Sequence, residues 1–174
     1  MTLFLDRDGV INRRRIDDYV KTPNEFEFED GVLEAIAKLS NYFERIVVVT
    51  NQQGVGRGLM QEKTLHEIHD YMKSEVEKAG GRIDAIYFCP DLRHSKSLFR
   101  KPNIGMGLLA KRQFPTIRFR QSVMVGDSIS DMKFGKNLGM KTVFISNDKS
   151  LLSTHSKLID QNFNSLFEYA KTCC

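Results

Sequence analysis

Two pairs of carboxylates follow two apolar runs of this 174-residue chain. The first pair, Asp6 and Asp8, comes directly after LFL. The second pair, Asp127 and Asp131, begins after VMVG. In extended backbone, residues two apart point to the same side, and in a helix residues four apart share a face, so each pair can face one pocket. Carboxylates held this close repel one another unless a cation or a shared proton compensates.

Each pair alone also has a simpler interpretation. The DRDG stretch can be an acidic turn, and Asp127 or Ser128 can merely cap a helix. For either pair taken singly, the simpler interpretation is favoured. The choice depends on where the surrounding elements place the two pairs.

The pattern of apolar residues indicates the elements that must position these carboxylates. Short apolar runs predict buried strands at 2–6, 45–51, 83–89, 122–127 and 141–146, the last of them being the final strand. Helical spacing predicts helices at 30–43, 62–81, 104–114 and 128–139, with Asp30 as the N-cap of the first. Strands that alternate with helices predict an α/β fold, a Rossmann-like three-layer α/β/α sandwich with a mainly parallel sheet.

Polar residues stand at the C-terminal ends of three predicted strands: Asp6, Thr50 with Asn51, and Asp127. Open α/β sheets bind ligands at this edge, so these strand ends are expected to meet in one site. Oxygen-only ligands suit a hard cation, Mg²⁺ above all. Lys101 is a candidate to offset the remaining negative charge, with Thr50 and Asn51 as hydrogen-bond donors. Together these parts suit phosphoryl transfer, in which a carboxylate nucleophile splits ester hydrolysis into two steps.

Four stretches resemble, in this order, the four motifs of the haloacid dehalogenase superfamily of phosphatases: FLDRDGVIN, VVVTNQQGVGRG, RKPNIGM and VMVGDSISDM. More narrowly, the chain is similar to the group that contains histidinol-phosphate phosphatases and D-glycero-D-manno-heptose 1,7-bisphosphate 7-phosphatases. The stretches DGVIN, YVKTPNEFEF, TNQQGVGRG and CP…RKPNIGM carry this closer match. The resemblance implies a Mg²⁺-dependent phosphatase of a small phosphorylated metabolite, with a heptose bisphosphate as the best match.

The resemblance also implies roles for the acidic residues. Asp6 would be the nucleophile and a metal ligand. Asp8 would be the general acid and base, with its main-chain carbonyl also on the metal. Asp127 would complete the metal site, and Asp131 would orient a water or Lys101.

The remaining matching residues would handle the substrate. By the same resemblance Thr50 and Asn51 would hold the phosphoryl oxygens, and Lys101 would stabilise the transferring group. Arg100 would meet the non-reacting part of the substrate. Arg57, in the GVGRG turn, is a further candidate for substrate contact.

The intervals between the motifs are too short for a second domain. About forty residues separate the first motif from Thr50, and roughly a dozen lie between the third predicted strand and Lys101, whereas domains rarely fall below about 50 residues. We therefore predict one domain over residues 1–174, with no separate cap domain and an open active site.

Cys89 and His94 have a spacing that a metal site could use, but structural zinc needs four nitrogen or sulfur ligands. The related group holds zinc through a Cys-x-His element and a later Cys-x-Cys element, and here SLF stands in place of the later thiols. We predict that structural zinc is absent. Leu98 and Phe99 are expected to anchor the loop by packing against the domain.

The composition, with 41% hydrophobic and 28% charged residues, is that of an ordinary globular protein. The net charge of +4 favours anionic ligands weakly and does not indicate a nucleic-acid partner. Three cysteines give no even disulfide framework, and no long apolar run predicts a signal peptide or membrane span. We expect a cytoplasmic protein with a small phosphate ester as its partner and no membrane association; the oligomeric state is not indicated. His66 and His69 are expected on a solvated helix face.

Two alternatives remain open at this point. An open site could instead admit histidinol phosphate or a nucleic-acid 3′-phosphate, although the latter calls for a basic stripe with aromatic residues, and only 13–15 form a basic cluster. A catalytically idle scaffold that binds phosphate or metal is the alternative of another class. The complete carboxylate set with Lys101 argues against it.

Overall fold

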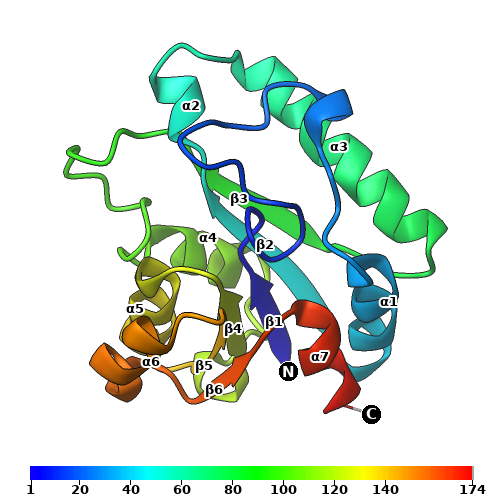
Figure 1. Ribbon diagram of the computed structural model, residues 1–174, viewed down its shortest axis with the longest axis vertical. Coiled ribbons are helices and arrows are strands. Elements are labelled where there is room, and N and C mark those ends of the chain that lie inside the picture. The colour runs from blue at the N-terminus through cyan, green and yellow to red at the C-terminus, as the bar shows by residue number, and fades with distance from the viewer. Residues whose placement is uncertain (174) are drawn as a thin grey trace.

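One parallel sheet forms the centre of the structure, a computed structural model that describes residues 1–173 (Figure 1). Within these residues, six strands lie in the order β3-β2-β1-β4-β5-β6, and every neighbouring pair is parallel. Their bounds are β1 Thr2–Leu5, β2 Arg45–Asn51, β3 Ala85–Cys89, β4 Val123–Gly126, β5 Lys141–Ile145 and β6 Gln161–Phe163. The predicted α/β class and parallel sheet are confirmed.

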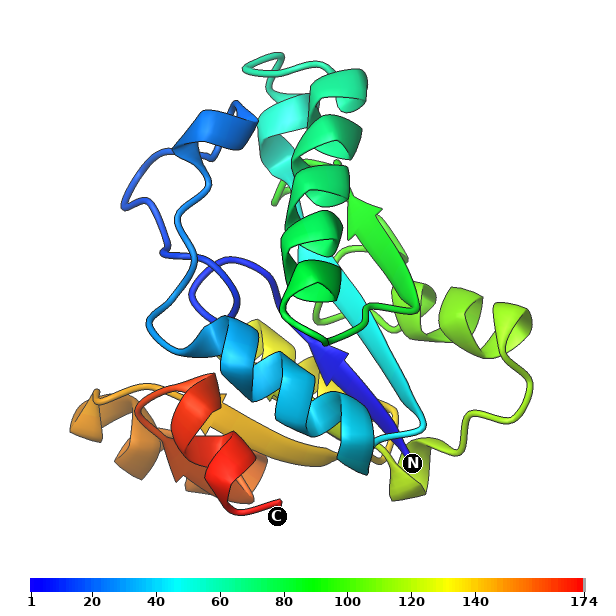
Figure 2. The same cartoon turned by 90° about the vertical axis from the view of Figure 1, so that its right-hand side faces the viewer.

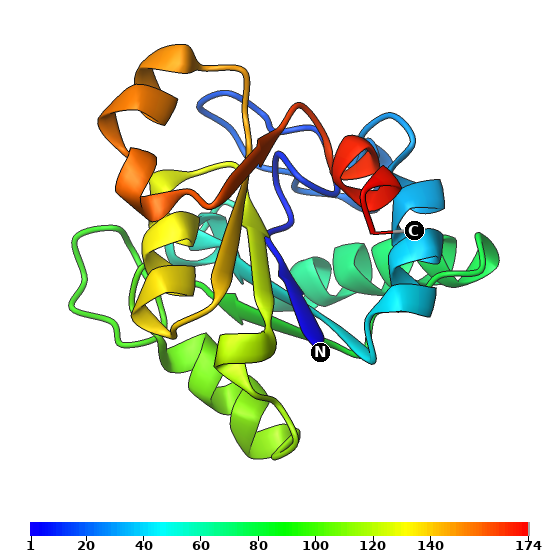
Figure 3. The ribbon, with the colours of Figure 1, turned by 90° about the horizontal axis from the view of Figure 1, so that it is seen from below.

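Helices cover both faces of this sheet, which gives three layers (Figure 2 and Figure 3). Their bounds are α1 Val32–Tyr42, α2 Gln53–Gly56, α3 Glu62–Lys78, α4 Gly105–Gln113, α5 Ile129–Asn137, α6 Lys149–Thr154 and α7 Leu166–Lys171. Short 3₁₀ turns stand at Pro23–Glu25, Phe119–Gln121 and Ser156–Leu158.

Successive side chains of a strand point to opposite faces of the sheet, so neighbouring residues of one strand pack against different helices. Leu3 and Leu5 of β1 belong to the core that α1, α3 and α7 cover, whereas Phe4 belongs to the core under α4 and α5. Because both faces are buried, the strands consist of nearly continuous apolar runs, which is why their positions are predictable from the sequence.

The structure corrects two expectations about the elements. A sixth strand, β6, follows the one predicted to be last, and its residues QNF carry no apolar run that could reveal it. Helix α1 begins with Gly31 as its N-cap rather than Asp30. Gly31 has φ +71°, and a Cβ there would lie 3.0 Å from the Phe167 ring, so a glycine lets α7 pack closely on the start of α1. Asp30 instead forms an exposed ion pair with Arg13.

The strand order places a ligand crevice at the end of β1. The chain runs from β1 outward to β2 and β3, then returns to form β4 on the other side of β1. Leu5 of β1 is in register with Val48 of β2 and Val125 of β4, so β4 ends one residue beyond β1, whereas β2 continues to Asn51. Open sheets bind ligands where the strand order reverses in this way. In the described part of the chain, every helix is too short or too polar to span a membrane.

Candidate active site

The turn after β1 brings the first aspartate pair against the end of β4. The main-chain N–H of Asp6 donates to the carbonyl of Val125 at 2.9 Å. Gly9 then turns the chain with φ +85°, and a Cβ at this position would lie 2.1 Å from Oδ2 of Asp127. Only glycine fits so close an approach, so the DRDG sequence determines how near Asp127 can lie to the turn.

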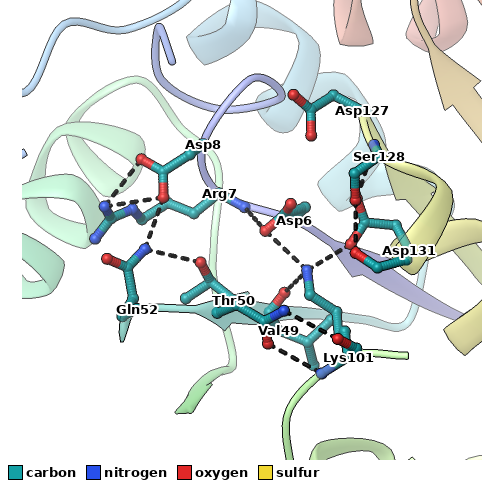
Figure 4. A network of polar contacts seen from close by, with 12 residues as sticks. Asp6, Arg7, Asp8, Val49, Thr50, Gln52, Lys101, Asp127, Ser128 and Asp131 are labelled. Atoms are coloured by element: carbon teal, nitrogen blue, oxygen red, sulfur yellow. Dashed lines mark hydrogen bonds and ion pairs between the residues drawn. The ribbon is translucent and has the colours of Figure 1, made fainter. Parts of the chain in front are cut away.

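Lys101 is buried at the centre of the site, with 3% of its surface exposed (Figure 4). Its Nζ lies 2.9 Å from Oδ1 of Asp6 and 2.6 Å from Oδ1 of Asp131, and it donates to the carbonyl of Val49 at 2.7 Å. Burial alone would lower the pKa of Lys101, but Asp131 and Asp6 outweigh it and raise that pKa. The lysine is therefore a fixed cation between two carboxylates.

The end of β2 holds the loop that carries Lys101. Oδ1 of Asn51 accepts from the Lys101 main-chain N–H at 3.0 Å, and Nδ2 of Asn51 donates to the Lys101 carbonyl at 3.2 Å. Both ends of the Asn51 amide are thus engaged in positioning Lys101. The Thr50 hydroxyl oxygen accepts from Nε2 of Gln52 at 2.9 Å, which leaves the Thr50 hydroxyl hydrogen available to a ligand.

Three carboxylates form a cluster beside Lys101. Ligand oxygens of Asp6, Asp127 and Asp131 all lie within 4.8 Å of one another. Burial and the neighbouring Asp131 raise the pKa of Asp6 well above its usual value despite Lys101. Burial, with Asp131 adding to it, raises the pKa of Asp127 to about 6. Burial is the larger cause of both shifts and the neighbouring carboxylate the smaller one, so a further cation among these side chains would favour their ionised forms.

The donor set of this cluster fits Mg²⁺. Oδ1 of Asp127 is buried and, among the described residues, has no hydrogen-bond partner. Asp131 is less available, because Lys101 contacts its Oδ1 and Ser128 donates to its Oδ2 from both the main chain and the hydroxyl, at 3.0 and 2.6 Å. Asp6 and Asp127 are therefore the carboxylates that could bind a hard cation directly.

The second aspartate pair is arranged differently from the prediction. Asp127 and Asp131 do not stack on one helix face, because Ser128 caps α5 and Asp131 completes a reciprocal capping box. The helix begins only at Ile129. A Cβ at Gly126 would lie 2.3 Å from the Asp131 Cβ, so glycine at the end of β4 allows the helix to approach the strand.

The Asp8 side chain points away from the cluster (Figure 4). It accepts from NH2 of Arg7 at 2.9 and 3.1 Å, from Nδ2 of Asn12 at 3.0 Å and from Nε2 of Gln52 at 2.7 Å. Burial raises the pKa of Asp8, but Arg7 and the other donors outweigh it and lower that pKa. The predicted use of its main-chain carbonyl on a metal stays a prediction.

His69 is buried, so the prediction of a solvated face is wrong for this residue, while His66 is exposed. Nε2 of His69 lies 3.2 Å from NH1 of Arg7. A guanidinium can only donate, so Nε2 accepts and the imidazole is neutral. Burial, with the charge of Arg7, lowers the pKa of His69 to about 3.

Acidification is therefore expected to destabilise the fold through His69. The pKa of His69 is lower in the folded protein than in the unfolded chain. The stability that the neutral imidazole contributes is therefore complete above the unfolded pKa of 6.5 and is lost as pH falls toward the folded pKa of about 3. In this window the free energy of unfolding should fall by about 1.4 kcal/mol per pH unit through this group. Denaturant titrations at pH 7.5 and 5.0 should show a smaller fall in His69→Gln than in wild type. Equal pH dependence in the two proteins would contradict this.

A cleft of about 930 Å³ opens over the site and is lined by the ends of β1 and β2 and by the loops around them. The predicted residues Asp6, Asp8, Thr50, Asn51, Arg57, Arg100, Lys101 and Asp131 all line it. Arginines from three further positions also line the cleft: Arg14, Arg15 and Arg93. Asp127 is not among the described residues that line this cleft, but its Oδ2 accepts from NH1 of Arg14, which does line it, at 2.9 Å.

The loop before Lys101 is held by polar contacts rather than by apolar packing. Leu98 and Phe99 are 74% and 43% exposed, so the expected anchor is wrong. Arg100 donates to the Asp91 carbonyl at 2.9 Å instead, and Asn103 donates to the Ser97 carbonyl at 2.7 Å.

Cys89 is buried at the start of this loop, and burial raises the pKa of its thiol. Its sulfur lies 3.5 Å from Oδ2 of Asp91 and 3.6 Å from the Ser97 hydroxyl. The predicted absence of structural zinc stays a prediction.

Known proteins match this chain over most of its length. The sequence pattern of the family described as polynucleotide kinase 3 phosphatase matches residues 2–149. The chain belongs to this family of haloacid dehalogenase phosphatases. It is a phosphoric monoester hydrolase, as predicted from the resemblance.

Individual relatives and one solved structure cover nearly the whole chain. A Mycobacterium bovis protein named D-glycero-alpha-D-manno-heptose-1,7-bisphosphate 7-phosphatase is 38% identical over 97% of this chain and 88% of its own length. A Helicobacter pylori protein named for the beta anomer is 31% identical over 97% of this chain and 96% of its own. The crystal structure of D,D-heptose 1,7-bisphosphate phosphatase from B. bronchiseptica, complexed with magnesium and phosphate, superposes with a TM-score of 0.89 at 31% identity. It covers 98% of this chain, which in turn covers 96% of that chain.

Proposed function

We propose that the chain is a Mg²⁺-dependent phosphatase that removes the 7-phosphate of D-glycero-D-manno-heptose 1,7-bisphosphate through an aspartyl-phosphate on Asp6. The observation that carries this proposal is the Asp6 carboxylate, held 2.9 Å from the buried Lys101 beside Asp127, at the base of a cleft lined with arginines. The names of the similar proteins from M. bovis, H. pylori and B. bronchiseptica support the substrate.

In the first step, an oxygen of Asp6 forms a bond to phosphorus while the bond to the sugar oxygen breaks. Lys101 offsets negative charge at the reacting centre, and the Thr50 hydroxyl donates to a phosphoryl oxygen. Asp6 and Asp127 would hold Mg²⁺, which when bound supplies further positive charge beside the nucleophile. Asn51 keeps Lys101 in place through its two main-chain contacts.

Asp8 handles the proton in both steps. As an acid it protonates the departing sugar oxygen, and as a base it takes a proton from the water that then attacks the aspartyl-phosphate. The donors around Asp8 favour its ionised form in the free protein, which suits the second step. The negative charge of a bound ester opposes ionisation and so favours the protonated form that the first step needs.

The arginines of the cleft fit a substrate with two phosphates. Arg57 and Arg100, with Arg14, Arg15 and Arg93, surround a space in which a second phosphate or the sugar can bind. The alpha-anomer relative from M. bovis is 38% identical to this chain and the beta-anomer relative from H. pylori 31%, so we expect the alpha anomer to be preferred.

A polynucleotide 3′-phosphate is the other substrate class that the family description suggests. Single-stranded nucleic acid is usually held by aromatic side chains on which bases stack. Among the described residues that line the cleft, Tyr19 is the one aromatic side chain, and its hydroxyl accepts from Gln53 at 2.7 Å. The lining therefore favours a small, highly charged ester.

A phosphate-release screen tests the proposal. The panel contains both anomers of the heptose bisphosphate, histidinol phosphate and a 3′-phosphorylated oligonucleotide, each with and without Mg²⁺. We expect kcat/KM for a heptose bisphosphate to exceed the others by at least about a hundredfold, which corresponds to roughly 2.7 kcal/mol of transition-state binding. A higher kcat/KM for histidinol phosphate or the oligonucleotide would overturn the proposed substrate assignment. Turnover that does not depend on Mg²⁺ would overturn the proposed role of Mg²⁺ as cofactor.

Removing the Arg14 side chain is expected to strengthen Mg²⁺ binding. Its guanidinium contacts Asp127, a proposed ligand, and competes there as a cation. Arg14→Gln should lower the Mg²⁺ dissociation constant by several fold, because an exposed ion pair of this kind contributes up to about 1 kcal/mol. Calorimetric titration with Mg²⁺ alone measures this, with Arg13→Gln as the matched control, since Arg13 pairs with Asp30 instead. Weaker or unchanged binding in Arg14→Gln would show that the two cations do not compete.

A further inference from the structure

Arg7 stands between the two aspartates of the first motif, and its side chain is almost completely buried, with 1% exposed. It follows the end of β1, and its guanidinium lies 5.9 Å from the centre of the Phe26 ring. Its NH2 contacts both oxygens of Asp8, at 2.9 and 3.1 Å. The charge of a buried arginine is thus directed at Asp8.

His69 holds this guanidinium from the other side. Its Nε2 accepts from NH1 of Arg7 at 3.2 Å, across 62 positions of sequence. The imidazole itself is fixed by its place on the buried face of α3 and by the Phe88 ring, whose centre is 5.9 Å away. Neither His69 nor Arg7 is among the described residues that line the cleft, so His69 would act on a substrate through Arg7 and Asp8.

Two further donors complete the holding of Asp8. Asn12 contacts Oδ1 at 3.0 Å, and Gln52 contacts Oδ2 at 2.7 Å. Each Asp8 oxygen therefore accepts from two donors, and 27% of the side chain stays exposed toward the cleft. Stability alone is a weak reason for this arrangement, because a buried ion pair often stabilises a fold no more than apolar residues of similar size.

We propose that His69 is a positioning residue for the reaction, which through Arg7 fixes the Asp8 carboxyl group at the wall of the cleft where the leaving group departs. This rests on the proposed function, in which Asp8 gives its proton to the leaving oxygen as the phosphorus–oxygen bond breaks. Without the His69 contact, Arg7 can rotate and Asp8 loses its orientation. Proton transfer to the leaving oxygen then becomes slower.

Leaving-group dependence separates this role from a purely structural one. A sugar or alkyl leaving group needs the proton of Asp8, whereas 4-nitrophenolate leaves without one. In His69→Leu, kcat/KM for the heptose bisphosphate should fall by about tenfold. Another alkyl phosphate that the wild type hydrolyses can serve in its place. The loss is smaller than the factor of about 10² to 10⁴ that proton transfer supplies, because Asp8 itself is retained. For 4-nitrophenyl phosphate, kcat/KM should fall by less than about threefold. His69→Gln, whose amide oxygen can accept from Arg7, should recover most of the difference.

His66→Leu is the matched control. His66 lies one turn earlier on α3 and packs against the same Phe88 ring, with centres 5.5 Å apart, but it is exposed and the described contacts show none to Arg7. Its ratio of kcat/KM for the two esters should equal that of wild type. Equal losses on both esters in His69→Leu, or no loss on either, would overturn the proposal. If His69→Leu does not fold, Arg7→Lys decides in the same way, because it keeps the charge but replaces the two nitrogens that contact Asp8 and His69 with one.

Asp8→Asn distinguishes failure of this inference from failure of the proposed function. One outcome overturns the positioning role alone. In it, Asp8→Asn lowers kcat/KM for the alkyl ester more than for 4-nitrophenyl phosphate, while the His69 and Arg7 variants keep the wild-type ratio of the two kcat/KM values. An equal loss on both esters in Asp8→Asn overturns the proton-transfer role of Asp8, and the inference with it.

Discussion

Asp6→Asn is expected to lower phosphate release by at least about a thousandfold and to leave the fold intact. An amide cannot attack phosphorus as a carboxylate does, so the first step is lost. The measurement is kcat for the best substrate of the screen, together with a denaturant titration of each protein.

Stability should behave in the opposite way to activity in this variant. Burial and the neighbouring Asp131 raise the pKa of Asp6 in the folded state, so its ionised form is less favourable there than in the unfolded chain. A neutral amide of the same shape removes this repulsion, so Asp6→Asn without Mg²⁺ should be at least as stable as wild type. Asp70→Asn, on the exposed face of α3, is the control and should keep full activity. If Asp6→Asn kept most of its activity, Asp6 could not be the nucleophile.

Replacing Lys101 should damage both activity and stability. In Lys101→Met, the carboxylates of Asp6 and Asp131 lose the cation that lies 2.9 and 2.6 Å from them. Removing one partner of a buried charge group costs about 3–5 kcal/mol of unfolding free energy. Loss of one electrostatic contact at the reacting centre costs a factor of about 10² to 10³ in kcat.

Mg²⁺ offers a check on the origin of that destabilisation. A divalent cation among the carboxylates should restore part of the lost stability of Lys101→Met, because it offsets the same charge. Lys133→Met, on the exposed side of α5, is the matched control and should change neither kcat nor the free energy of unfolding. A loss of stability below about 1 kcal/mol in Lys101→Met would show that Lys101 is not the main counter-charge.

Much of the fold could be predicted from the sequence, because buried parallel strands are continuous apolar runs and their ends carried the polar residues of the site. β6 could not, since two of its three residues are polar and it pairs only at the edge of the sheet. The start of α1 depends on the packing of Phe167 against Gly31, a contact between segments far apart in the sequence.

The site was predictable where one residue acts from the end of one strand, and less so where residues act through one another. Asp6, Asp8, Thr50 and Lys101 were singled out, and all of them line the cleft. Arg7 and Gln52 were missed, because their roles consist of contacts with Asp8 and Thr50 rather than with a ligand.

His69 was also misplaced, although the sequence held a signal. It lies four residues after Leu65 and three before Met72, which are both buried, so it belongs to the apolar stripe of α3. A histidine in such a stripe needs a buried partner, and the arginine between the two aspartates of the first motif is a natural candidate.

Asp6 is tested as the nucleophile by finding which residue carries the phosphoryl group during turnover. Wild-type protein with saturating substrate and Mg²⁺ is quenched in acid, digested, and mapped by mass spectrometry. We expect one added phosphoryl group on the N-terminal peptide, at Asp6, and none in Asp6→Asn. A phosphoryl group on any other residue, or its absence from wild type while a rapid burst of alcohol release precedes steady turnover, would contradict it.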